Sequence, residues 1–428
     1  MIMTLFEQHQ LPCLLESRLS NRYQTIVMEH MTVNSTNAPG AKSLEHHTQS
    51  WASTQATWRF YHNDNVTFPM LSSPILGLAR AGVKETQSPY VLMAHDWCRI
   101  NFSKHHSKFD KTQMSHALDV GYELQASLLI DADTGEPIAP AGLNLLTDKG
   151  IYQCRSEDIQ PKQSHLDSLF ESIQWQEQLR LDKPLVHVVD READSAKDLR
   201  RLGSINWLTR TKKASTFRHE GQFKTAEAIG RSLNPDIKGV VSIRGREGYL
   251  FVGETKVELQ RKSEKLASQA PECRLVMSLV TDEKGNELAR WYLLSNVFDV
   301  DATEVAMWYC HRWNIESWFK LLKTNGHQLE KWQQTTGELI LKRLIVASVS
   351  TTLVFKLYSD KSEEANEFKG FLVKLSGRLT KRSKPVTHSA LLAGLWVFLQ
   401  MCEVLNTYTT EEINRMKELA RSFFAQYV

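Results

Sequence analysis

The sequence predicts an α/β fold that carries helical regions at both ends. From residue 90 to residue 209, apolar or alternating runs that are typical of strands come first and are then interleaved with helix-like stretches. The first seventy residues lack strong strand patterning. From Glu338 onward, apolar residues recur with helical spacing and show little strand signal.

The strand-like runs follow a definite order along the chain. Three successive strands come first, with turn residues between them: Tyr90–Phe102, Gly121–Ile130 and Pro137–Leu146. A helix over residues 163–179 then leads to the strand Leu185–Val189. A short helix over residues 195–202 and a strand over residues 206–209 complete the series. Three strands followed by alternating helices and strands is the order of a ribonuclease-H-like fold.

We expect three regions from these patterns. Residues 1–70 should form a helical domain, with Trp58, Phe60 and Tyr61 in its core. Residues 71–335 should form the α/β core, interrupted by a β-rich insertion at about residues 212–290. Residues 336–428 should form a helical C-terminal region, which is a candidate for dimerisation.

Composition points to a soluble cytoplasmic protein. The six cysteines show no C-x-x-C pair and no zinc-finger spacing with histidine, so we expect reduced thiols. The N-terminal MIMTLFEQHQ lacks the basic start of a signal peptide. The longest apolar run, Ala390–Met401, is too short to span a bilayer and suits a buried helix.

The positive charge of the chain is concentrated in one segment. The net charge is only +3, but residues 200–265 contain fifteen Lys and Arg against seven Asp and Glu, a local charge of +8. Such a block is the electrostatic footprint of contact with a phosphate backbone, although a solvated basic surface would have the same composition. Arg210 and Lys212 are our candidate phosphate-binding residues within it.

The most informative stretch is YCHRWNIESWFKLLK, over residues 309–323. Five side chains in it fall within an arc of roughly 80° on one side of a helix: Tyr309, Arg312, Glu316, Lys320 and Lys323. The opposite side is apolar and should be buried: Trp308, Ile315, Phe319 and Leu322. One carboxylate in a row of cations suits a metal ion beside phosphates. An amphipathic helix with i,i+4 ion pairs is the plainer interpretation.

Two upstream acids could share a metal ion with Glu316, because Mg²⁺ prefers several oxygen ligands. Asp96 lies inside an apolar run that resembles a buried strand, and Asp190 directly follows another. An acid in such a position costs desolvation energy unless it is paired or metal-bound. Asp190 could instead cap a helix, but Asp194 fits that role better because it stands before SAKDLRRL.

These motifs carry a resemblance to a known family over roughly residues 58–345. One series resembles the Tyr-Arg-Glu-Lys signature of DDE transposases in the bacterial insertion-sequence-four group: Tyr309-x2-Arg312-x3-Glu316-x6-Lys323. The DREAD run, Asp190–Asp194, is similar to the segment that carries the second catalytic Asp of that family. Asp96 stands where the first would stand, although Trp97 and Cys98 follow it in place of the family's small hydroxyl residues.

The resemblance implies a two-metal site for phosphodiester chemistry. Its catalytic and metal-binding residues would be Asp96, Asp190 and Glu316, holding two Mg²⁺ ions for which Mn²⁺ can substitute. The residues that grip phosphates around the cut would be Tyr309, Arg312, Lys320 and Lys323. Trp291 would stack on a flipped base, or else be a core or edge-strand aromatic. Trp313, on the polar side of the helix, would wedge against an unstacked base.

The resemblance also implies the biological reaction and its partners. We expect a transposase that cuts double-stranded DNA at terminal inverted repeats and joins the ends into target DNA, through a hairpin intermediate. Residues 1–70 would bind the DNA ends, and a homodimer would hold both ends together. The protein would be cytoplasmic and bacterial, and bound to the nucleoid through DNA. Two alternatives stay open: a ribonuclease-H-like nuclease without strand transfer, and a catalytically silent DNA-binding derivative.

Overall fold

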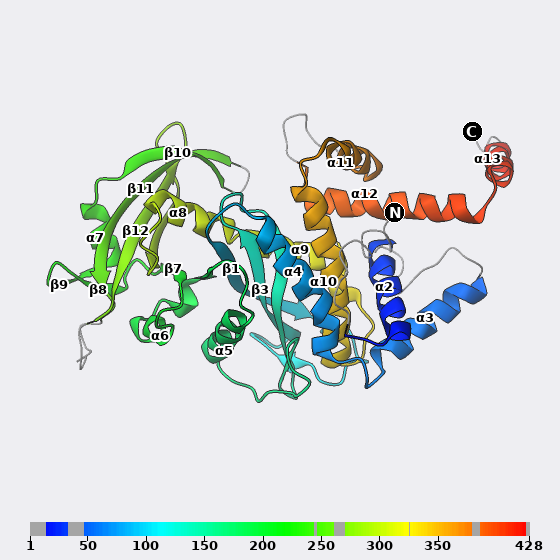
Figure 1. Ribbon diagram of the computed structural model, residues 1–428, viewed down its shortest axis with the longest axis horizontal. Coiled ribbons are helices and arrows are strands. Elements are labelled where there is room, and N and C mark those ends of the chain that lie inside the picture. The colour runs from blue at the N-terminus through cyan, green and yellow to red at the C-terminus, as the bar shows by residue number, and fades with distance from the viewer. Residues whose placement is uncertain are drawn as a thin grey trace.

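The computed structural model describes residues 14–32, 47–243, 246–260, 270–324, 326–378 and 386–424. Within these residues the protein is a mixed α/β molecule, with one open, mostly antiparallel sheet of thirteen strands. Helices of both chain ends gather at one side of the molecule, and the insertion lies at the other (Figure 1).

The first seven strands build the centre of the sheet. They are β1 (Val91–Asn101), β2 (Thr112–Gln113), β3 (Val120–Asp131), β4 (Pro137–Leu146), β5 (Ile151–Gln153), β6 (Leu185–Val189) and β7 (Trp207–Thr211). Their spatial order is β5-β4-β3-β1-β6-β7, and the short β2 pairs with β3. The strands from β5 to β1 are antiparallel to their neighbours, whereas β1, β6 and β7 are parallel. The strands predicted from the sequence in this region are therefore confirmed.

The insertion continues the same sheet instead of folding apart from it. Its elements are β8 (Thr216–His219), β9 (Gln222–Thr225), α7 (Ala226–Ser232), β10 (Asp236–Ile243), β11 (Arg246–Glu258), β12 (Glu272–Thr281) and β13 (Glu287–Ser295). Strand β13 pairs with β7 in antiparallel register, and β12, β11, β8 and β9 follow outward, with β10 on β11. The segment predicted as a β-rich insertion, at about residues 212–290, contains these six strands and one helix.

Helices cover both faces of the central strands (Figure 1). Those before β7 are α2 (Ser17–Thr32), α3 (His47–Tyr61), α4 (Phe68–Glu85), α5 (His165–Gln178), the 3-10 helix η1 (Arg191–Ala193) and α6 (Ala196–Arg201). Those after β13 are α8 (Ala302–His311), α9 (Asn314–Leu322), the 3-10 helix η2 (Leu329–Lys331), α10 (Gly337–Ser359), α11 (Glu363–Leu375), α12 (His388–Thr407) and α13 (Thr410–Phe424). Helical ends were expected, and both are present.

Burial of the aromatic residues in α3 differs in part from the prediction. Phe60 and Tyr61 are buried as expected, but Trp58 is 61% exposed. Its indole stacks on the imidazole of His62 at 3.9 Å between ring centroids. Phe60 packs against Tyr23 of α2, and the carbonyl of Tyr61 accepts a hydrogen bond from Lys342 of α10. Trp58 is not buried with them, so the prediction for Trp58 was wrong.

Among the described residues, one helix is long and apolar enough to cross a membrane on length and composition alone. This is α12. The most apolar 18-residue stretch of this helix is 41% buried inside the protein. A core helix of a soluble protein meets the same criteria.

Candidate active site

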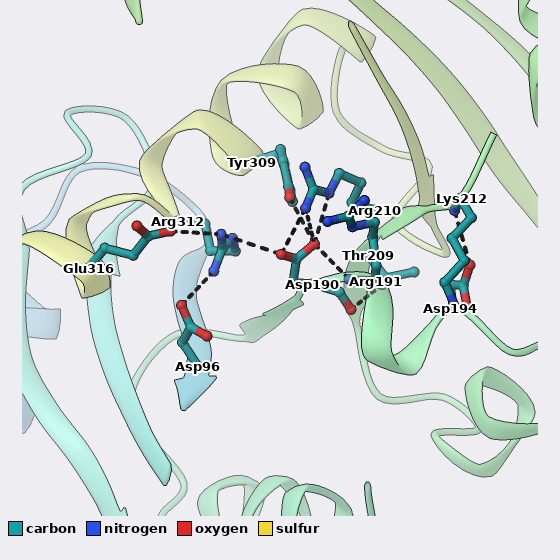
Figure 2. Close-up of polar contacts among 10 residues, drawn as sticks. All are labelled: Asp96, Asp190, Arg191, Asp194, Thr209, Arg210, Lys212, Tyr309, Arg312 and Glu316. Carbon is teal, nitrogen blue, oxygen red and sulfur yellow. Dashed lines mark hydrogen bonds and ion pairs between the residues drawn. The ribbon is translucent and has the colours of Figure 1, made fainter. Parts of the chain in front are cut away.

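Three carboxylates from distant parts of the chain converge on one guanidinium (Figure 2). Asp96 lies on β1, Asp190 directly follows β6, and Glu316 lies in the first turn of α9. Nη1 of Arg312 donates to Oδ2 of Asp96 at 3.0 Å. Its Nη2 lies 3.7 Å from Oδ2 of Asp190 and 3.3 Å from Oε1 of Glu316. All three acids singled out in the sequence therefore lie around Arg312.

The strand register explains why the two aspartates meet. The parallel pairing of β1 and β6 ends at Ala94 with Val188. Asp96 and Asp190 each lie two residues beyond this last pair, on the same face of the sheet. The strands separate there, at the carboxyl ends of parallel strands, where α/β sheets commonly bind ligands.

Arg312 is the most enclosed member of the cluster. Its side chain is 6% exposed, whereas those of Asp96, Asp190 and Glu316 are 25%, 30% and 29% exposed. Burial alone would lower the pKa of Arg312, but nearby Tyr309, Asp96 and Asp190 raise it above its ordinary value. The guanidinium therefore stays charged at the point where the carboxylates meet.

Asp190 is held by more donors than any other acid of the cluster. Arg210 binds it through two hydrogen bonds, from Nε at 2.8 Å and from Nη2 at 2.9 Å, and the hydroxyl of Tyr309 donates at 3.2 Å. Burial would raise the pKa of Asp190, but Arg312, the backbone N–H of Arg191 and Arg210 outweigh it and lower that pKa. Asp190 is thus fixed in its ionised form.

Glu316 has the opposite electrostatic balance. Burial raises its pKa above the ordinary value, and the nearby charge of Asp96 adds to this, although Arg312 and Lys320 oppose it. A raised pKa means that these surroundings stabilise the anionic carboxylate less well than water does. An additional cation beside Glu316 would relieve this cost.

The signature stretch is divided between two helices, α8 and α9, where one continuous helix was expected. At the junction the backbone N–H groups of Trp313, Ile315 and Glu316 donate to carbonyls three residues earlier instead of four. This tighter turn still leaves Tyr309, Arg312 and Glu316 on the side that faces the aspartates (Figure 2). The predicted apolar side is confirmed, because its four residues are buried: Trp308, Ile315, Phe319 and Leu322.

The two lysines of the signature are placed differently from one another. Lys323 donates to the carbonyl of Arg99 and lies 3.1 Å from a carboxylate oxygen of Glu330, so it is engaged within the protein. Lys320 is exposed, and its ammonium lies 5.7 Å from the ring centroid of Trp313. Trp313 is itself 39% exposed, which agrees with its expected place on the polar side.

Asp194 does not belong to the carboxylate cluster. Its carboxylate accepts hydrogen bonds from the backbone N–H of Lys212 at 3.0 Å and from the hydroxyl of Ser215 at 2.9 Å. The residue before α6 is Ser195, so the expectation that Asp194 caps this helix was wrong. Asp194 instead ties the DREAD segment to the loop that begins the insertion.

A basic cleft of about 490 Å³ opens beside Asp190. Six cations line it: Arg191, Arg210, Lys212, Lys213, Arg231 and Arg290. Four of them form ion pairs: Arg231 with Glu227 at 2.7 Å, Arg290 with Glu287 at 2.8 Å, Arg210 with Asp190 at 2.8 Å and Lys212 with Asp194 at 3.5 Å. Trp291 also lines the cleft, and its ring meets that of Tyr309 edge-on with centroids 5.4 Å apart.

Sequence reasoning missed part of this cleft and the position of Arg312. Arg191 lies next to Asp190, and its charge was the available signal. Arg312 was expected on phosphates and is found between the carboxylates instead. Its contact with Asp96 joins residues 216 positions apart, which no local pattern can reveal.

The three carboxylates have the chemistry of ligands for a divalent cation, but in this structure they surround the guanidinium of Arg312. In the described part of the chain, no group of three His, Cys, Asp or Glu side chains is arranged to hold a metal ion. The Arg312 guanidinium lies between the carboxylates. Their oxygens are hard ligands of the kind that Mg²⁺ prefers. The place where they converge already holds one positive charge, that of Arg312.

No protein-family model matches the sequence, and no curated protein matches it.

Proposed function

We propose that this protein is a DDE transposase of the insertion-sequence-four type, which cuts DNA at transposon ends and joins them to target DNA. The observation that carries the proposal is the convergence of Asp96, Asp190 and Glu316 on one site beside a basic cleft. Three acids from separate segments rarely gather without a shared partner, because each pays a desolvation cost. A phosphodiester with divalent cations supplies such a partner.

The arrangement of the sheet supports a ribonuclease-H-like core. Its central spatial order is β4-β3-β1-β6-β7, with three antiparallel strands followed by two parallel ones, and the chain order of these strands is the one expected from the sequence. In such a core the first and fourth long strands are neighbours, which accounts for the proximity of Asp96 and Asp190. The insertion before α8 enters at the position expected from the family resemblance.

The proposed metal ligands are Asp96, Asp190 and Glu316, for two Mg²⁺ ions or for Mn²⁺ in their place. When bound, the ions would activate the attacking oxygen and stabilise the leaving oxygen. Arg210 and the Tyr309 hydroxyl hold the Asp190 carboxylate in a fixed orientation. Arg312 would release the acids and turn its charge toward a bound phosphate, since guanidinium groups bind carboxylates and phosphates in the same geometry.

The basic cleft is the proposed path of the DNA strand next to the cut. Lys212 and Lys213 supply charge, and Trp291 supplies an aromatic wall. Stacking of a base on an aromatic side chain contributes about 1–3 kcal/mol, which can offset the cost of unstacking that base from the duplex. A flipped base against Trp291 is the feature that favours a hairpin over simple hydrolysis.

The helical ends suit the remaining parts of the reaction. Helices α2 and α3 would bind the transposon ends, and the exposed Trp58 lies on α3. The C-terminal helices would form the homodimer that pairs two ends. Four apolar side chains on α12 and α13 are exposed and available for such a contact: Met401, Leu405, Met416 and Leu419. The protein would act in the cytoplasm, on the bacterial nucleoid.

An in vitro reaction separates this function from its two alternatives. The substrate is linear DNA that ends in the inverted repeats flanking the gene, with Mg²⁺ and a target plasmid. Joined products support the transposase, whereas cut but unjoined DNA indicates a ribonuclease-H-like nuclease. DNA that is bound and left uncut indicates a catalytically silent derivative and would overturn the proposal.

The dimer is tested by mixing subunits. Inactive Glu316→Ala protein is combined with parental protein on paired ends. A dimer that cuts one end with each subunit gives products with only one end cut, in proportion to the mixing ratio. If the fraction of DNA that is cut at only one end does not change with the mixing ratio, the two subunits do not act as a pair, and the proposed dimer is contradicted.

A further inference from the structure

Two buried histidines lie on the sheet behind the acid cluster. His95 precedes Asp96 on β1, and His187 stands three residues before Asp190 on β6. Both imidazoles are 0% exposed. Adjacent residues in a strand point to opposite faces, so the histidines face α5 while the acids face α8 and α9. No step proposed so far uses them.

The two imidazoles belong to a continuous chain of hydrogen bonds across four elements. Nδ1 of His95 lies 2.9 Å from the hydroxyl of Ser127 on β3, and its Nε2 lies 2.9 Å from Nδ1 of His187. Nε2 of His187 then lies 2.9 Å from a carboxylate oxygen of Glu177 on α5. The chain thus connects β3, β1, β6 and α5 beneath the proposed active site.

The chemistry of the last partner fixes the direction of every bond. An ionised carboxylate only accepts, so His187 donates to Glu177 through Nε2–H and is left to accept at Nδ1. His95 must then donate through its own Nε2–H, and its Nδ1 accepts from the Ser127 hydroxyl. Burial lowers the pKa of both histidines, which agrees with neutral rings that each carry one proton.

This chain lies where backbone pairing between the acid-bearing strands stops. The β1–β6 pairing joins Val91–Ala94 to Leu185–Val188, and His187 stands opposite Met93 within it. The contact from His95 to His187 therefore crosses the two strands at the end of the ladder. Asp96 and Asp190 follow on strands that are separating.

We propose that His95 and His187 are positioning residues that set the separation of Asp96 and Asp190. This inference rests on the proposed function, in which those two acids hold the divalent cations. A buried polar pair contributes less stability than an apolar pair of the same volume, and its benefit lies in a single defined geometry. Groups that hydrogen-bond to metal ligands typically change metal affinity by about 10–100-fold when they are removed. The two histidines would act on the acids through the backbones of β1 and β6 instead.

The test compares two substitutions of one histidine in the full-length protein. His95→Leu removes the donor to His187, whereas His95→Gln keeps an N–H group near the position of Nε2. Mn²⁺ binding is measured by electron paramagnetic resonance, and nicking of end DNA is measured as kcat and KM. We expect His95→Leu to weaken Mn²⁺ binding about 10–100-fold and to lower kcat with little change in KM. His95→Gln should retain most of both.

Two further proteins control for a general loss of stability. The double variant His95→Leu/His187→Leu leaves no unpaired imidazole, so it should fold even if His95→Leu alone does not. Its Mn²⁺ binding should be weakened as in His95→Leu. His327→Leu removes a buried histidine remote from the cluster and should bind Mn²⁺ as the parental protein does. Thermal unfolding of all variants shows which ones are folded.

Parental Mn²⁺ binding in folded His95→Leu or in the double variant would overturn the inference, as would equal losses in His95→Leu and His95→Gln. A different result would show that the proposed function itself fails: if the acids do not hold a cation, Asp96→Ala leaves Mn²⁺ binding unchanged. In that event the crystal structure of the double variant decides. A change of about 0.5 Å or more between the Asp96 and Asp190 carboxylates supports positioning, and unchanged carboxylates reject it.

Discussion

Arg312 and Asp96 form an ion pair of 3.0 Å between residues that lie 216 positions apart in the sequence. The same guanidinium reaches Asp190 and Glu316. One buried positive charge therefore contacts all three carboxylates, and Arg210 adds a second one at Asp190. In the proposed reaction, divalent ions would take the place of Arg312 between the acids.

Removal of each acid should abolish strand cleavage and spare DNA binding. Asp96→Asn, Asp190→Asn and Glu316→Gln keep the shape of each side chain but lose the charge that holds a cation. Affinity for DNA arises mainly from phosphate contacts elsewhere, so it should change little. Gel-shift and cleavage assays on the same end DNA measure both properties. Cleavage at the parental rate by any one variant would exclude that acid from the site.

Asp194→Ala serves as the contrasting variant within the DREAD segment. Its carboxylate organises the loop that carries Lys212 and Ser215 and makes no contact with the cluster. Loss of these buried hydrogen bonds should lower the free energy of unfolding by about 1–3 kcal/mol. Cleavage should persist at temperatures where the variant is folded. An Asp194→Ala protein that is folded and inactive, beside an active Asp190→Ala protein, would reverse the assignment.

Neutral residues in the basic cleft should flatten the salt dependence of DNA binding. Lys212→Gln combined with Lys213→Gln should lower the slope of log K against log salt by about 0.9 for each lost phosphate contact. Lys224→Gln with Lys256→Gln is the matched control, because these two lysines belong to the insertion but do not line the cleft. Equal slopes for the cleft variant and the parental protein would show that Lys212 and Lys213 contact solvent and no DNA phosphate.

Trp291→Ala and Trp313→Ala should retain first-strand nicking and lose hairpin formation. Closing a hairpin unstacks a base at a cost of a few kcal/mol, and an aromatic wall returns about 1–3 kcal/mol of it. Denaturing gels of end-labelled DNA should show nicked strands that accumulate without hairpins. Hairpins formed by both variants at the parental rate would assign these tryptophans to packing.

Buried histidines should make the fold sensitive to acid. Burial, with the nearby charge of Arg343, lowers the pKa of His30 and brings that of His327 to about 3. The unfolded chain therefore binds more protons than the folded one below about pH 6.5, so stability is lost as pH falls through that value. Between pH 7.5 and 5.5 the lowered pKa of His327 removes about 1.4 kcal/mol of stability.

His327→Gln tests this linkage by urea denaturation at the two pH values. The variant takes up one proton fewer on unfolding, so its loss of unfolding free energy should be smaller by about 1.4 kcal/mol. An unchanged slope in His327→Gln would mean that this ring is protonated in the folded protein.

The sequence was sufficient for the elements with strong periodicity and not for contacts between distant segments. Pro137–Leu146 and Leu185–Val189 were predicted with the bounds that the structure shows, because both are continuous apolar strands with turn signals beside them. The division of the signature at Trp313 was missed, since a shift from i−4 to i−3 hydrogen bonds leaves the apolar spacing almost intact.

The site shows the same limit. Spacing placed Arg312 on the face of Glu316, and this holds in the structure. It could not show whether a carboxylate or a phosphate is its partner, because both bind a guanidinium in one geometry. The exposure of Trp58 and the loop contacts of Asp194 also depend on packing between segments that are far apart in sequence.

The most direct test of the proposed metal site is anomalous diffraction from crystals of the parental protein with end DNA, grown with Mn²⁺. Non-cleavable phosphorothioate ends keep the DNA intact. We predict anomalous peaks between the carboxylates of Asp96, Asp190 and Glu316, with Arg312 moved away from Asp96. A cluster without such peaks at saturating Mn²⁺, with the Arg312–Asp96 ion pair still in place, would contradict the proposed two-metal site.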